Sequence, residues 1–146
     1  MAIAQLANVL KFFGIDAGEP DPQEKQALVR EALLMTLARA TNADTNVKTV
    51  EVETVRRIYQ EATGHEVSSK DVRMAANADL FDEAPLDQYL SRIHGKIDDD
   101  DQRLIVRSLA QVIKADGRIS PLEVDFFNDV VGALRMTPDQ ITGLLD

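Results

Sequence analysis

The chain contains no cysteine and only two histidines among its 146 residues. The absence of cysteine excludes disulfides, thiolate metal sites, cysteine nucleophiles and thiol redox chemistry. The sequence also lacks any apolar run that approaches the ~20 residues required by a membrane-spanning helix. These absences argue against a disulfide scaffold, a thiol-dependent enzyme and an integral membrane protein.

Positive charge is also scarce. Lysine and arginine total 16 against 25 aspartates and glutamates, which gives a formal net charge of −9. A nucleic-acid-binding protein of this size needs a basic face, and the sequence shows none. The acidity fits solubility, cation binding or a basic partner. We therefore expect protein partners and no nucleic acid, and we place the protein in the cytoplasm.

Sequence motifs for catalysis are missing as well. The chain has no G-x-S-x-G, H-E-x-x-H, P-loop or G-x-G-x-x-G pattern. His65 and His94 lie in polar contexts near predicted helix ends and are expected to be solvated surface residues without a partner. The sequence therefore predicts a non-enzymatic protein with no catalytic residues and no organic cofactor.

Helical periodicity runs through most of the chain. Apolar residues recur at steps of three and four, and no segment sustains an alternating pattern between turn signals. The predicted fold class is all-α, a bundle of about seven to eight helices in one domain. Within this domain of residues 1–146, we expect an N-terminal helix and loop at 1–20 and a first hairpin at 21–66. Connecting helices follow at 67–97, and a second hairpin with a C-terminal helix at 98–146.

Two segments stand out by their hydrophobicity. The stretch "QEKQALVREALLMTLARA" at residues 23–40 is apolar nearly all round in its middle, which predicts a central buried helix. Near the N-terminus, apolar residues recur at helical spacing, at Ile3, Leu6, Leu10 and Phe13. They favour a first helix packed on the bundle, and peripheral membrane contact through residues 1–15 is the alternative. This segment lacks a basic start, so no secretory signal is expected.

Several helix starts carry capping residues. Asp21 precedes a proline and Ser68 precedes an acidic first turn, as N-cap residues do. The stretch from Ser120 to Glu123 has the S-P-x-E pattern of a capping box with proline at the first helical position. The acidic run Asp98–Asp101 is interpreted as a cap that complements a helix macrodipole.

An internal repeat relates two helix–turn–helix segments. The stretches "ADTNVKTVEVE" and "ADGRISPLEVD" share the pattern A-D-x-x-(V/I)-x-x-(V/L)-E-V-(E/D). A constant offset of 72 residues pairs Asp44 with Asp116 and Glu51 with Glu123. The repeat predicts an internal duplication in which two related αα-hairpins form a four-helix core.

The second copy also resembles half of a calcium-binding EF-hand loop. In that alignment Val112 and Lys114 would occupy the first ligand positions, and neither binds calcium. A true EF-hand is therefore rejected, and two interpretations remain. In the first, the acids are helix caps only. In the second, symmetric pairing brings four carboxylates together to bind a hard cation of the calcium or magnesium class: Asp44, Glu51, Asp116 and Glu123.

The same residues carry a family resemblance. From about Leu28 to Leu134 the chain resembles the TerB-like family, which includes tellurite resistance protein TerB and the N-terminal domains of DjlA-type co-chaperones. The resemblance rests on "KADGRISPLEVDFF" and its degenerate copy "NADTNVKTVEVETV", which has Thr45 in place of the glycine. It implies an all-helical bundle whose acids hold a metal, carried onto Asp116 and Glu123 and, through the repeat, onto Asp44 and Glu51.

The resemblance and the residues together favour a particular function. We expect a TerB-like protein associated with tellurite resistance and stress response, non-enzymatic, with a divalent cation as its candidate ligand. Because the chain has no thiols, it is not expected to reduce tellurite directly. The alternative is a protein–protein interaction scaffold whose acidic residues serve only as helix caps.

Overall fold

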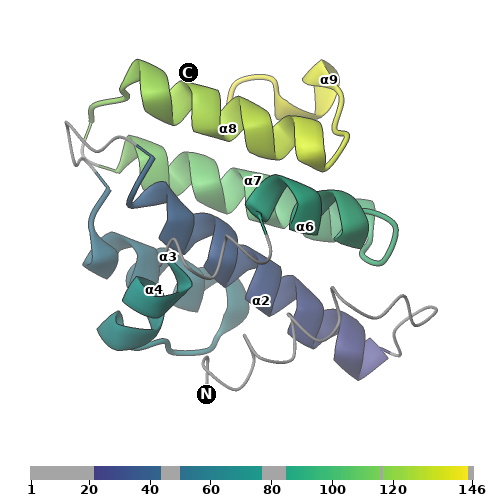
Figure 1. The fold of residues 1–146 in the computed structure, drawn as a ribbon, viewed down its shortest axis with the longest axis horizontal. Coiled ribbons are helices and arrows are strands. Elements are labelled where there is room, and N and C mark those ends of the chain that lie inside the picture. The colour runs from purple at the N-terminus through teal and green to yellow at the C-terminus, as the bar shows by residue number, and fades with distance from the viewer. Residues whose placement is uncertain (1–21, 44–49, 77–84, 116, 145–146) are drawn as a thin grey trace.

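A computed structural model of the chain describes residues 22–43, 50–76, 85–115 and 117–144, which form seven helices and no strand (Figure 1). The all-α class predicted from the sequence is confirmed. The helices are α2 (Pro22–Ala40), α3 (Val52–Thr63), α4 (Ser69–Ala75), α6 (Leu86–Ile93), α7 (Asp99–Lys114), α8 (Pro121–Ala133) and α9 (Pro138–Ile141).

Helix α2 is the centre of the bundle, as its hydrophobicity predicts. It packs against α3, α4, α6, α7 and α8, and its most extensive contact is with α7. Figure 1 shows it crossing the middle of the molecule. Burial on all sides explains why its sequence has no polar face in the middle. Its buried residues are Leu28, Val29, Glu31, Ala32, Leu33, Leu34, Met35, Thr36, Leu37, Ala38 and Ala40.

The other helices cover two sides of the α2–α7 pair. Helices α3 and α4 pack together on one side, and α6 and α8 pack together on the other (Figure 1). Helix α9 packs against α7. The two predicted hairpins thus correspond to the contacting helix pairs α2–α3 and α7–α8, and their origin by internal duplication stays a prediction.

Predicted capping residues do begin helices in the structure. The Ser120 hydroxyl accepts from the Glu123 N–H at 3.2 Å, and the Glu123 carboxylate accepts from the Ser120 N–H at 2.9 Å. Asp98 and Asp101 form an equivalent capping box on α7, and the Ser68 hydroxyl caps α4. Such a cap contributes on the order of 1 kcal/mol to stability.

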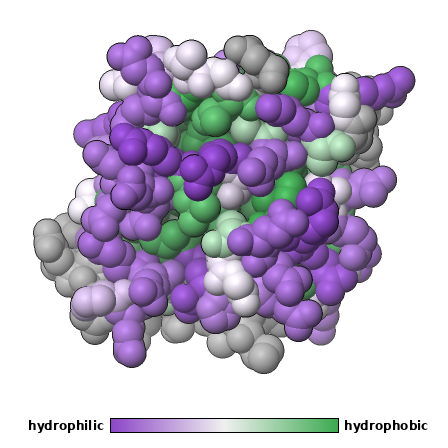
Figure 2. All heavy atoms as spheres, turned by 180° about the vertical axis from the view of Figure 1, so that it is seen from behind, coloured by the Kyte–Doolittle hydropathy of each residue, from purple (hydrophilic) through white to green (hydrophobic). Residues whose placement is uncertain are grey.

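The surface is largely polar over this core. Seen from behind in Figure 2, hydrophilic side chains cover most of the face, and hydrophobic atoms show in the furrows between them. Among the described helices, none has the length and apolar character needed to cross a membrane. The first helix, the membrane alternative at residues 1–15 and the Asp21 cap lie outside the described residues.

Candidate functional site

The structure describes two of the four residues of the predicted carboxylate site, Glu51 and Glu123. Asp44 and Asp116 lie outside the described residues. Glu51 is exposed at the start of α3 and makes no side-chain capping bond there. Glu123 is 1% exposed at the start of α8. Among the residues that the structure describes, no three or more histidines, aspartates or glutamates group closely enough to hold a metal ion.

The two described acids differ in their local role. Glu123 Oε1 is engaged by the Ser120 N–H, so the capping interpretation accounts for this residue. Glu51 occupies the N-cap position of α3 without a side-chain cap hydrogen bond, so capping does not account for it. In Figure 1 the C-terminal ends of α2 and α7 and the N-terminal ends of α3 and α8 lie at the same end of the bundle, at the left. The described helix ends that flank both acidic motifs therefore lie at that end.

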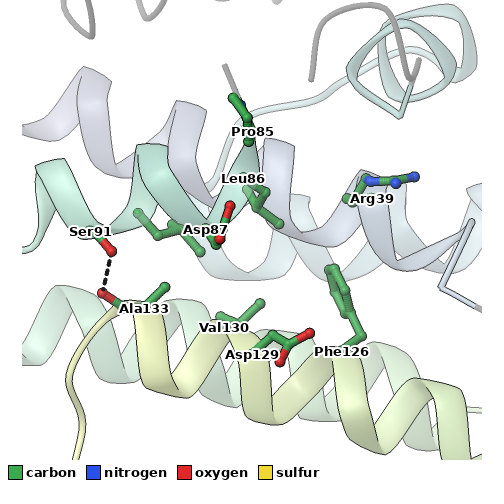
Figure 3. A pocket seen from close by; sticks show the side chains of 10 residues that line it. Arg39, Pro85, Leu86, Asp87, Ser91, Phe126, Asp129, Val130 and Ala133 are labelled. Atoms are coloured by element: carbon green, nitrogen blue, oxygen red, sulfur yellow. Dashed lines mark hydrogen bonds between the residues drawn. The ribbon is translucent and has the colours of Figure 1, made fainter. Parts of the chain in front are cut away.

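A groove opens between α6 and α8. Its volume is about 670 Å³. Figure 3 shows α6 above it and α8 below, with side chains of both helices pointing into the space between them. The Ser91 hydroxyl, which donates to the Ala133 carbonyl at 3.4 Å, joins the two helices at one end. The residues that line this α6–α8 groove are Arg39, Pro85, Leu86, Asp87, Leu90, Ser91, Phe126, Asp129, Val130 and Ala133.

Two apolar residues at and just before the start of α8 are accessible to solvent. Leu122 is 45% exposed and Ile119, just before the helix, is 37% exposed. Phe126 is partly buried and lines the groove, whereas Phe127, its neighbour in sequence, is 2% exposed. The apolar residues of this segment therefore lie on two sides of the helix, one buried and one accessible to solvent.

Charges at the groove are mainly acidic. Asp87 on α6 and Asp129 on α8 are both exposed, and Arg39 on α2 lies at the opposite edge of the opening (Figure 3). Two carboxylates and one guanidinium thus line the groove of a chain whose net charge is −9. Sequence analysis missed the groove because its lining comes from three helices that are distant in the chain.

A second feature that sequence analysis missed is a polar cluster inside the core. Glu31 on α2 is 4% exposed, and it lies near the buried Tyr59 of α3 and Tyr89 of α6. Burial raises the pKa of the Glu31 carboxyl to about 8, although the Arg30 guanidinium acts in the opposite direction. Burial also raises the pKa of the Tyr89 hydroxyl, and Glu31 adds to that effect. At neutral pH, Glu31 is therefore mostly protonated.

The expectation that both histidines are solvated and unpartnered is wrong for His94. Its Nδ1 lies 2.7 Å from the Oε1 of Gln102, which is 2% exposed. Since an amide oxygen only accepts hydrogen bonds, Nδ1 is assigned as the donor. The contact joins the end of α6 to the first turns of α7. His65, as expected, is exposed.

These features define an all-helical bundle domain with acidic turns and an accessible groove. The sequence model of the family described as tellurite resistance protein TerB matches residues 30–144. The chain belongs to this family, and the resemblance proposed from its two acidic motifs is confirmed. No curated protein matches the chain. No solved structure matches it either.

Proposed function

We propose that this member of the TerB family is a non-enzymatic cytoplasmic protein that serves tellurite resistance and the stress response by binding another protein. The binding surface is the α6–α8 groove together with the accessible side of α8. The observation that carries the proposal is the exposure of Leu122, which precedes the groove-lining Phe126 by about one turn of α8, together with the apolar side chains of both helices in the groove. Contiguous exposed apolar surface with a polar rim is typical of a site for another molecule.

The occupant that fits best is an amphipathic helix of a partner protein with basic residues beside its apolar stripe. The groove lies between two helices, and its apolar lining includes Leu86, Leu90 and Val130. Apolar partner side chains spaced by three and four residues would fill it. Asp87 and Asp129 at the rim would attract lysines or arginines of that partner and set its orientation.

This proposal predicts charge-selective peptide binding. A fluorescein-labelled helical peptide of leucine and lysine, with leucines along one face, is expected to bind the full chain. Its counterpart with glutamate in place of lysine is expected to bind at least about tenfold more weakly. The variants Phe126→Ser and Asp129→Lys should each weaken the basic peptide. Fluorescence anisotropy measures all these affinities.

A matched control distinguishes binding in the groove from non-specific hydrophobic binding. Met74 on α4 is 36% exposed and does not line the groove, so Met74→Ser should leave peptide binding unchanged. Equal affinity for the two peptides would contradict the proposal. A wild-type dimer that Phe126→Ser converts to a monomer in analytical ultracentrifugation would also contradict it, because the occupant of the groove would then be a second copy of the chain. Binding that strengthens on removal of residues 1–15 would make the chain's own N-terminus the occupant.

A second candidate function is divalent-cation binding at the two acidic turns. It is favoured because the described helix ends that flank both turns lie at one end of the bundle (Figure 1). The presence of Glu51 at a helix start where its side chain forms no cap also favours it. The ligands would be oxygens of four carboxylates, which suit calcium or magnesium. They are Asp44, Glu51, Asp116 and Glu123.

Calorimetric titration with calcium chloride and magnesium chloride tests this candidate. If the four carboxylates form one site, wild type binds one of these ions, and Asp44→Asn, Glu51→Gln and Asp116→Asn each weaken binding by about tenfold or more. The control Asp139→Asn changes an exposed acid in the first turn of α9 and should have no effect. No heat with either ion in wild type would leave the acids as caps and turn residues only.

A further inference from the structure

A second concave surface, separate from the groove, opens between α2, the end of α3 and the start of α7. Its volume is about 640 Å³, and it shares no lining residue with the α6–α8 groove. We call it the α2–α3–α7 cleft. Its polar and charged lining includes Lys25, Arg30, Thr63, His65, Asp98 and Asp101.

Arg30 forms the cationic wall of this cleft. Its Nε is buried and has no hydrogen-bond partner within the described residues, and no ion pair found there includes its guanidinium. By contrast, the guanidiniums of Arg56 and Arg103 are paired with Glu53 and Asp100. A buried Nε–H without an acceptor is costly, because this donor has lost water without gaining a hydrogen bond.

The acid next to Arg30 in sequence does not neutralise it. Burial raises the pKa of the Glu31 carboxyl to about 8, so this carboxyl is mostly uncharged at neutral pH. A guanidinium keeps its charge under the same conditions. Arg30 is therefore a positive group with an unpartnered Nε donor, and it lines a cleft large enough for a small molecule.

The start of α7 forms an acidic wall in the same cleft. Asp98 pairs with Lys25 at 3.1 Å, and Asp101 accepts from the Asp98 N–H at 3.0 Å. The Lys25 ammonium offsets one of these two carboxylates, so negative charge remains on this wall. A doubly charged anion such as phosphate would be attracted by Arg30 and repelled by this wall.

We propose that the α2–α3–α7 cleft binds a small zwitterion that carries one carboxylate and one ammonium group, as a free amino acid does. The carboxylate pairs with the guanidinium of Arg30, and the ammonium lies toward the carboxylates of Asp98 and Asp101. Opposite charges on the two walls select a molecule with both groups over a simple anion or a simple cation. This site is independent of the protein-binding groove.

The test is titration of the full-length protein, followed by amide chemical shifts in NMR spectra. Each of the standard amino acids is added separately, with acetate, inorganic phosphate and ethylammonium as comparison ligands. At least one amino acid is expected to bind with a dissociation constant below about 10 mM, and at least about tenfold more tightly than the three comparison ligands. The shifted amides should lie in α2 and at the start of α7.

Two variants assign the charges. Arg30→Met should weaken the binding of the amino acid with the highest affinity by at least about tenfold, because a charged hydrogen bond is lost. Asp101→Asn keeps an oxygen that can accept from the Asp98 N–H, so it should preserve the fold. It should weaken the binding of the amino acid and leave the binding of acetate unchanged. The control Arg57→Met removes an exposed arginine that pairs with Glu61 on α3 and should change neither ligand.

Three results would overturn the proposal. The first is that no amino acid binds with a dissociation constant below about 10 mM. The second is acetate or phosphate binding as tightly as the best amino acid, which would indicate a plain anion site. The third is unchanged amino-acid affinity in a folded Asp101→Asn protein, a result that does not depend on whether Arg30→Met folds.

Discussion

The variant Glu31→Gln is expected to be more stable than wild type at about pH 9 and nearly as stable as wild type at about pH 4.5. The glutamine retains the size of the side chain but has no proton to lose. In wild type, burial raises the pKa of Glu31 from 4.5 to about 8. A shift of this size corresponds to roughly 5 kcal/mol as an upper estimate.

The direction of the effect follows from proton binding in the two states. Between the two pKa values, the folded protein holds a proton on Glu31 that the unfolded chain has released. Folding therefore takes up a proton, and the free energy of unfolding falls as the pH rises. The contribution of Glu31 is fully present below its unfolded pKa of 4.5 and is lost as the pH rises through about 8.

Urea unfolding of both proteins at a series of pH values measures this difference. The stability of Glu31→Gln relative to wild type should increase steadily across the window, since the variant lacks the proton-linked loss. Glu66→Gln changes an exposed glutamate and serves as the control, for which no such trend is expected. Parallel stability curves for wild type and Glu31→Gln would show that Glu31 ionises in the folded protein as readily as in the unfolded chain.

The variant Leu109→Ala is expected to lose about 2–5 kcal/mol of stability. Leu109 is 0% exposed on α7, the helix that makes the longest contact with central α2. Its truncation removes apolar contacts and leaves a cavity that closely packed neighbours fill only in part. The loss is a large share of the total stability of an ordinary domain, about 5–15 kcal/mol.

Chemical denaturation of Leu109→Ala and Leu122→Ala compares the same substitution at a buried and an accessible position. Leu122 is 45% exposed, so its truncation should cost less than about 1 kcal/mol. Leu122→Ala should instead weaken binding of the basic peptide, because this side chain borders the proposed docking surface. Equal destabilisation by the two variants would mean that Leu122 contributes to the core as Leu109 does.

Local patterns predicted the elements of the fold well. The capping box from Ser120 to Glu123 needs only neighbouring residues, and the same holds for Ser68 at the start of α4. The apolar middle of α2 predicted its central position, because a helix without a polar face is stable only when it is covered on all sides. Family membership was likewise carried by short motifs, and the family match over residues 30–144 confirmed it.

The candidate site was less accessible to sequence reasoning. The repeat identified four acids as possible partners, yet convergence depends on how two hairpins pack, and Asp44 and Asp116 lie outside the described residues. The accessible side of α8 was hidden within a single apolar pattern. Leu122 and Phe127 belong to the same periodicity and differ only because α6 and α7 cover one side of the helix.

The sequence by itself determined the helices, the caps of α4, α7 and α8, and the central place of α2, because each of these depends on residues within a few positions of one another. Only the tertiary structure decided that Glu31 is buried beside Tyr89, that Arg30 and Asp101 line the same cleft, and that α6 and α8 enclose a groove. Burial and charge pairing depend on which helices meet across the core, and helical periodicity does not encode which helices those are.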